Sequence, residues 1–146
     1  MTKVTPDWSA LREAAKAAAQ RAYAPFSNYR VGAAAFTDGG RLVTGCNVEN
    51  SSYGLGLCAE CGLISELINT GGGLLTAFCC VNGAGDLITP CGRCRQLLYE
   101  HAASDLLIET PLGIVTINEL LSQPFKLSAA LSVEPVSELG PNRDEQ

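Results

Sequence analysis

The sequence contains little histidine and no cluster of lysine and arginine, and each shortage argues against a class of function. Ten basic residues stand against fifteen acidic ones, which gives a formal net charge of −5. Because contacts to phosphates supply much of the affinity for nucleic acids, this balance argues against a nucleic acid polymer as partner. The single histidine, His101, falls on the apolar stripe of a predicted helix, which argues against a hydrolase with a histidine base. A small uncharged substrate fits this composition better.

Long apolar segments are also missing. No run approaches the ~18 apolar residues that a membrane span needs, and the N-terminus lacks the apolar stretch of a signal peptide. We therefore expect a cytoplasmic protein that does not bind membranes. Seven cysteines, an odd number, fit that reducing compartment, where thiols serve as metal ligands or buried side chains rather than as disulfides.

The chain is expected to form one domain over residues 1–132, followed by a polar, flexible tail over residues 133–146. Its 47% of hydrophobic and 17% of charged residues are typical of a compact globule rather than a disordered chain. Helical and strand patterns alternate, which predicts a layered α/β domain. The expected elements are a helix from Thr5 as cap with Pro6 at its first position, strands at 29–36 and 41–48 joined by a hairpin turn, a helix at 57–68, a strand at 74–81, a helix within 87–103, strands at 105–110 and 113–117, and a short helix at 117–121.

Two cysteine pairs share one spacing, in "LCAEC" at 57–61 and in "PCGRC" at 90–94. Each pair lies where a helix should begin, and the free N–H groups and partial positive charge of a helix N-terminus stabilise thiolates. Two such pairs predict a zinc site. If all four thiols bind, the site is closed and structural, whereas three ligands leave a position open for catalysis.

Glu60 stands between the cysteines of the first pair and adds negative charge beside the thiolates. A structural zinc site has no need of it, but a glutamate that moves protons next to a zinc-bound water would belong there. On residue types alone, a solvated helix glutamate fits the position equally well. A thioredoxin-like dithiol would explain "CGRC" but not "CAE".

These motifs resemble the signature of the zinc-dependent nucleoside and nucleobase deaminases, in which "CAE" is followed by "PCxxC". More of the chain resembles the small cytidine deaminases that act on free nucleosides. The stretches that carry the resemblance run in order from Tyr23 to Phe125 and are "YAPFSNYRVGAAA", "GCNVEN", "PCGRCRQ" and "ELLSQPF".

The resemblance implies a three-layer α/β/α fold with a mixed central sheet. It implies a homotetramer with active sites shared between subunits and one zinc ion per subunit. The implied reaction is the hydrolytic deamination of cytidine and deoxycytidine to uridine and deoxyuridine with release of ammonia, as in pyrimidine salvage. Cys58, Cys91 and Cys94 would be the zinc ligands, and Glu60 would shuttle protons between a zinc-activated water and the base.

The same resemblance assigns the nucleoside contacts. Asn47 and Glu49 would hold the ribose, and their i, i+2 spacing at a strand end puts them on one side. Tyr29 would lie beside the base, the backbone at Ala59 would bond the pyrimidine edge, and Phe125 would reach in from a neighbouring subunit. Without the resemblance, Asn47 and Glu49 would be interpreted as the solvated end of a strand, and Phe125 as a residue of the core.

The sequence departs from the family pattern behind the ligands. The residue after the catalytic glutamate is usually an arginine that offsets the charge of the sulfurs, but here it is Cys61. Arg95 or Arg93 could compensate, and the sequence does not show which. Phe26 and Tyr29 also exchange the usual Tyr and Phe. Two other functions stay open, a zinc-stabilised binding module without catalysis and a deaminase of another aminated base, such as guanine.

Overall fold

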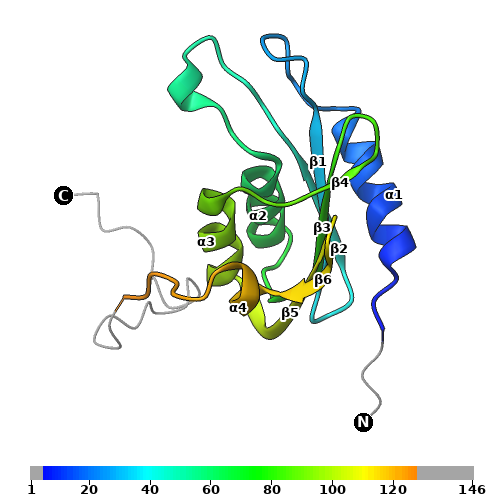
Figure 1. The fold of residues 1–146 in the computed structure, drawn as a ribbon, viewed down its shortest axis with the longest axis vertical. Helices are drawn as coiled ribbons and strands as arrows, with labels where there is room; N and C mark the ends of the chain where they lie inside the picture. Colours follow the sequence, from blue (N-terminus) through cyan, green and yellow to red (C-terminus); the bar gives the residue numbers. More distant parts are fainter. Residues whose placement is uncertain (1–4, 128–146) are drawn as a thin grey trace, which may run out of the picture.

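The computed structural model describes residues 5–127, so the predicted tail over 133–146 and the domain boundary at 132 lie outside the described residues. Helices and strands alternate along the described chain, as the sequence predicts (Figure 1). The elements are α1 (Trp8–Ala19), β1 (Val31–Thr37), β2 (Leu42–Cys46), a 3-10 turn η1 (Tyr53–Leu55), α2 (Ala59–Asn69), β3 (Leu75–Asn82), β4 (Leu87–Ile88), α3 (Gly92–Glu100), β5 (Ala102–Thr110), β6 (Gly113–Thr116) and α4 (Ile117–Leu120).

The start of α1 differs from the prediction. Its cap is Asp7 rather than Thr5, and one carboxylate oxygen of Asp7 accepts a hydrogen bond of 2.9 Å from the Ala10 N–H. Pro6 therefore precedes the helix instead of occupying its first position. A carboxylate caps at least as well as a hydroxyl and also favours the positive end of the helix dipole, which explains why Asp7 takes the role.

The sheet is mixed, with strand order β2-β1-β3-β5-β6, and β4 pairs with β3 as well. β1 and β2 form the predicted antiparallel hairpin, whereas β3 and β5 run parallel because the chain crosses over through α3. β5 begins at Ala102, three residues before the predicted strand, because Ala102 pairs with Leu75 of β3. This pairing ends α3 at Glu100.

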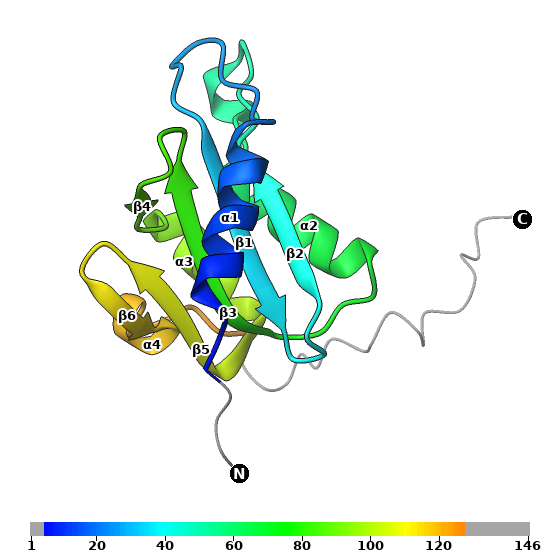
Figure 2. The same ribbon diagram turned by 90° about the vertical axis from the view of Figure 1, so that its right-hand side faces the viewer.

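Side-chain alternation along β1 separates two cores. Ala33 and Ala35 pack with the buried leucines of α2 and α3, whereas Ala34 packs against Leu11 and Ala15 of α1. Figure 1 shows α2 and α3 on one side of the sheet and α1 on the other, and Figure 2 shows α1 crossing the sheet. The predicted three-layer α/β/α fold with a mixed sheet is therefore confirmed. None of the helices within residues 5–127 is both long and apolar enough to cross a membrane.

A glycine brings α2 into backbone contact with β2. A Cβ at Gly45 would lie 2.2 Å from the carbonyl oxygen of Ala59 and 2.3 Å from the nitrogen of Leu63. No side chain fits at such distances, so glycine is required for this approach. Because Ala59 opens α2, the contact fixes where that end of the helix lies.

Candidate active site

Three cysteine sulfurs converge where α2 and α3 begin. Cys58 caps α2, Cys91 caps α3, and Cys94 is buried in the first turn of α3. Their sulfurs all lie within 4.8 Å of one another. Three thiolates on a tetrahedral zinc ion, each about 2.3 Å from the metal, would be about 3.8 Å apart, so small side-chain movements suffice. The donor set and its spacing therefore fit zinc.

Two helix N-termini and partial burial set the properties of these thiols. Burial raises the pKa of the Cys94 thiol, and the nearby Glu60 carboxylate raises it further. Burial acts in the same direction on Cys91, but hydrogen bonds from the Cys94 backbone and side chain outweigh it and lower the pKa of Cys91. A thiol near helix N–H groups is a ready metal ligand.

Cys61 lies outside this sulfur cluster and meets Arg93 instead. An Nη2–H group of Arg93 donates to the Cys61 sulfur across 3.2 Å, and this sulfur, followed by those of Cys58 and Cys94, raises the pKa of Arg93. Arg95 turns away, since its guanidinium donates to the carbonyl oxygens of Pro90 at 2.9 Å and Leu120 at 3.2 Å. Of the two arginines between which the sequence could not choose, Arg93 is the one beside Cys61.

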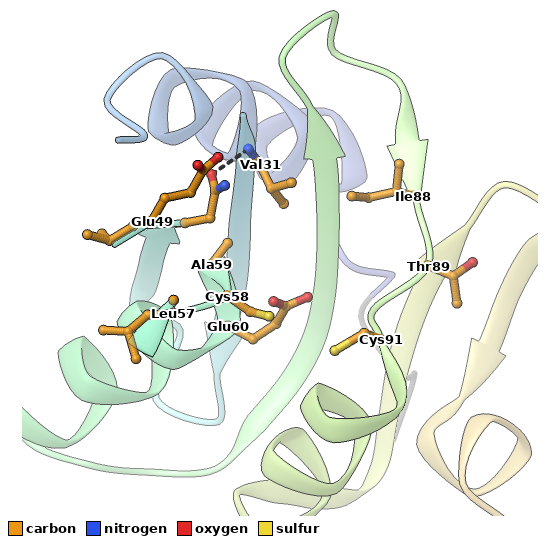
Figure 3. Close-up of a pocket in the computed structure, with 12 residues that line it drawn as sticks. Val31, Glu49, Leu57, Cys58, Ala59, Glu60, Ile88, Thr89 and Cys91 are labelled. Carbon is orange, nitrogen blue, oxygen red and sulfur yellow. Dashed lines mark hydrogen bonds between the residues drawn. The ribbon is translucent and has the colours of Figure 1, made fainter. Parts of the chain in front are cut away.

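Glu60 reaches a cavity next to the sulfurs. Its side chain belongs to the first turn of α2 and is only 4% exposed. The cavity has a volume of about 270 Å³, near the lower end of the usual range for small-molecule sites. In Figure 3, Cys58, Glu60 and Cys91 point toward one another at its inner end. Ala59 lines it too, and its N–H has no acceptor within the helix because it opens α2.

Asn47 and Glu49 line the same cavity and are both held by backbone partners. The Asn47 side-chain oxygen accepts from the Val31 N–H at 2.8 Å, and its amide donates to the Tyr29 carbonyl oxygen at 2.9 Å. The Glu49 carboxylate accepts from the N–H groups of Phe26 and Ser27 and from the Ser27 hydroxyl. These bonds orient both side chains before any ligand arrives.

Aromatic side chains surround a second cavity that shares Asn47 and Glu49 with the first. Tyr29 lines it and is 52% exposed, and Phe26 packs edge-to-face on Tyr53 with ring centroids 6.2 Å apart. The exchanged pair of aromatics, Phe26 and Tyr29, therefore lines this outer cavity, which adjoins the inner one at Asn47 and Glu49.

Phe125 lines neither of these two cavities. Its side chain is 68% exposed, while its backbone N–H and carbonyl oxygen bond the Gln96 side chain at 2.9 and 3.0 Å. Gln96 thus fixes the backbone at Phe125, while the aromatic ring is exposed.

Sequence reasoning missed several residues of the cavity. The remaining lining residues, which no functional prediction named, are Val31, Val48, Gly56, Leu57, Ile88 and Thr89. Cys80 on β3 is fully buried behind them and donates its S–H to the Ile88 carbonyl oxygen at 3.3 Å. Burial raises the pKa of this thiol, and Glu60 adds to the effect. Strand alternation could have placed Cys80 on the side of α2 and α3.

Comparison with known proteins agrees with this geometry. The model of the cytidine and deoxycytidylate deaminase zinc-binding region matches residues 7–110. The cytidine deaminase of Mycobacterium tuberculosis is 54% identical over 121 residues, which cover 83% of this chain and 91% of that protein. The crystal structure of cytidine deaminase from Mycobacterium leprae is 57% identical, with a TM-score of 0.80 over 82% of this chain and 100% of that one. The structure of the Burkholderia pseudomallei cytidine deaminase is 40% identical, with a TM-score of 0.71 over 80% and 98%. The chain therefore belongs to the cytidine and deoxycytidylate deaminase family of zinc-binding proteins.

Proposed function

We propose that this protein hydrolyses the exocyclic amine of cytidine and deoxycytidine, giving uridine or deoxyuridine and ammonia, a reaction of pyrimidine salvage. One observation carries the proposal. Three cysteine sulfurs lie within 4.8 Å of one another, and two of these cysteines, Cys58 and Cys91, line the same cavity as the buried Glu60. A zinc-stabilised binding module would not require a buried carboxylate beside its thiolates, because such a charge is costly unless it does chemistry or is paired.

The zinc ligands and Glu60 would have different roles in the reaction. Zinc held by Cys58, Cys91 and Cys94 would supply a Lewis acid that makes water nucleophilic near neutral pH. Glu60 would accept one proton from the attacking water and deliver it to N3 of the cytosine ring, where it stays in the product. It would then take the second proton from the new hydroxyl on C4 and pass it to the amine, so that ammonia leaves as the C4 carbonyl forms. The buried position of Glu60 excludes bulk water, so the proton it carries is delivered to the base.

Asn47 and Glu49 would orient the sugar. Both line the cavity wall that leads to the sulfurs, and their backbone partners hold them in place. A pre-oriented amide and carboxylate can bind ribose hydroxyls without first losing side-chain freedom. The N–H of Ala59 is available for the pyrimidine edge, and Tyr29 borders the outer cavity through which a nucleoside would enter.

The direct test is incubation of the zinc-loaded protein with cytidine, with the ultraviolet change and the released ammonia followed together. Deoxycytidine should react as well. Cytosine, adenosine and guanine serve as comparisons. A preference for cytosine would indicate a deaminase of the free base, and a preference for adenosine or guanine would indicate a deaminase of another base. Absence of ammonia from every nucleoside, with zinc bound and the fold intact, would leave the binding-module interpretation.

We further infer that the active unit is a homotetramer in which Phe125 serves a neighbouring subunit. The ring is exposed and lines neither cavity of its own chain, yet its backbone is fixed by Gln96. Its exposure leaves the ring accessible to a partner subunit, where the resemblance to the family assigns it. All seven cysteines, which lie within the described residues, are free thiols, which supports a reducing cytoplasmic location.

Phe125→Ala is expected to raise the KM for cytidine more than tenfold. Stacking of a base on an aromatic ring is worth roughly 1–3 kcal/mol, and this variant removes the ring while it keeps the backbone bonds to Gln96. Leu112→Ala is the matched control, because Leu112 is 98% exposed and lines neither the inner nor the outer cavity. Light scattering that finds a fully active monomer would refute the shared site.

Cys61→Ser is expected to keep one zinc ion per chain and to change activity by no more than ~10–100-fold, the usual range for residues behind metal ligands. The Cys61 sulfur lies outside the cluster, and a serine oxygen can accept the Arg93 N–H in its place. Cys58→Ser, measured in parallel for zinc content, should lose the metal. If Cys61→Ser loses zinc as Cys58→Ser does, the metal has four thiolate ligands and the site is structural.

A further inference from the structure

Side chains of α3 hold the segment that follows α4. Residues 121–127 form neither helix nor strand, so the position of this segment depends on contacts to its backbone and side chains. Arg95 donates to the Leu120 carbonyl oxygen at 3.2 Å, where the segment begins. Near its other end, the Lys126 ammonium lies 5.3 Å from the centre of the Tyr99 ring. Helix α3 therefore contacts the segment at both ends.

The contact from Gln96 lies between these two and is reciprocal. Its side-chain oxygen accepts from the Phe125 N–H at 2.9 Å, and its side-chain nitrogen donates to the Phe125 carbonyl oxygen at 3.0 Å. A carboxamide carries a donor and an acceptor in one plane, so it can pair with a backbone as a neighbouring strand would. Because both backbone groups of Phe125 are bound, the direction of its Cα–Cβ bond, and so of its exposed ring, is set by α3.

The same helix begins at two of the proposed zinc ligands. Cys91 caps α3 and Cys94 lies in its first turn, and Gln96 follows Cys94 by two residues. These residues span little more than one helical turn, which is a rigid unit. The turn that binds the metal of one chain therefore also carries the side chain that fixes Phe125.

We propose that Gln96 is a positioning residue that acts on the neighbouring subunit, because it holds Phe125 where the ring covers the cytosine bound in the neighbour's active site. The inference rests on the proposed function, including its shared active site. Gln96 lines neither the inner nor the outer cavity of its own chain, so it is not expected to touch the substrate of its own subunit.

Gln96→Ala is expected to raise the KM for cytidine about 5–10-fold, because the ring remains but two hydrogen bonds that fix it are lost. The kcat should change little, since Glu60 and the zinc ligands are untouched. Gln96→Glu keeps the acceptor but cannot donate to the Phe125 carbonyl oxygen, so its KM should lie between those of Gln96→Ala and the parent. Gln20→Ala is the matched control, because that amide bonds the Gly83 carbonyl oxygen at 3.5 Å and lines neither cavity.

Mixed oligomers show on which subunit Gln96 acts. A Glu60→Gln chain is inactive in its own site but offers an intact Phe125 to its neighbour, whereas a Gln96→Ala chain keeps its own chemistry. The two chains, refolded together with zinc, should form active sites with the KM of the parent protein, which neither chain forms alone. A chain that carries both Glu60→Gln and Phe125→Ala should not give this rescue. In the Phe125→Ala background, Gln96→Ala should add no further rise in KM, because the two residues act through one ring.

The outcomes separate this inference from the proposed function. Parent protein that does not deaminate cytidine would overturn the proposed function. A rise in KM for Phe125→Ala, with both Gln96 variants at the parent value, would overturn only the role of Gln96. A raised KM that mixing does not rescue would place the effect within one subunit and would also reject the inference. Light scattering and zinc content are measured for every variant, and Gln96→Glu replaces Gln96→Ala in the mixture if the latter does not assemble.

Discussion

Glu60→Gln is expected to retain zinc and the fold while its kcat for cytidine falls by at least ~10²–10⁴. The carboxamide has nearly the shape of the carboxylate, so the first turn of α2 and the cavity wall should persist. It cannot accept a proton from water or return one to the base. At about 1.4 kcal/mol per tenfold in rate, the loss corresponds to roughly 3–5 kcal/mol of transition-state stabilisation.

Glu66→Gln provides the matched control on the same helix. The Glu66 carboxylate accepts from the Thr44 N–H at 2.6 Å, which ties α2 to β2 away from the cavity. That variant should lose some thermal stability but retain turnover. Steady-state kinetics with zinc content measured on the same samples decides the matter. Near-normal turnover by folded, zinc-loaded Glu60→Gln would remove Glu60 from the mechanism.

Gly45→Ala is expected to displace α2 from β2, and thereby to weaken zinc binding and lower the stability of the fold. The added Cβ would lie 2.2 Å from the Ala59 carbonyl oxygen and 2.3 Å from the Leu63 nitrogen, and both are backbone atoms that cannot rotate away. Helix α2 must therefore shift from β2 and carry Cys58 and Glu60 away from α3. Overpacking typically costs about 1–3 kcal/mol and occasionally more, and we expect the upper end here because backbone must move.

Thermal melting and zinc titration of Gly45→Ala should both respond, with Tm about 10 °C lower. Gly54→Ala is the control, because a Cβ at Gly54 meets nothing within 4 Å. It exchanges the same residue types without a collision, so its Tm and zinc affinity should match those of the parent. Unchanged melting and metal binding in Gly45→Ala would mean that the contact between β2 and α2 is looser than described.

Local spacing predicted much of the site, and long-range packing decided the rest. The cysteine pairs indicated helix N-termini because capping and i, i+3 contacts depend on neighbours in sequence, and Cys58 and Cys91 do cap α2 and α3. The choice between Arg93 and Arg95 could not be made in this way. The two stand two positions apart on one helix, and only the packing of α3 beside α2 determines which one meets Cys61.

The same distinction applies to the fold. The strand at Leu75–Asn82 was predicted from a continuous apolar run, which reflects burial on both faces. The early start of β5 at Ala102 could not be predicted from the sequence, because it depends on the pairing of Ala102 with Leu75 in β3. The bonds from Phe26 and Ser27 to Glu49 escaped prediction for a similar reason, since they join segments more than twenty residues apart. At the start of α1 the prediction of Thr5 as the cap was wrong, because the carboxylate of Asp7, two residues later, accepts from the Ala10 N–H.

The crossover between the two ligand-bearing helices sets the order in which the protein can be assembled. Cys58 lies before β3 and Cys91 after it, while β3 itself must insert between β1 and β5. Contacts so distant in sequence form late, after loop-closure entropy has been overcome. A nascent chain therefore has no complete metal site until the centre of its sheet is closed. Zinc uptake during refolding should report the finished topology, and it should lag behind the appearance of helix.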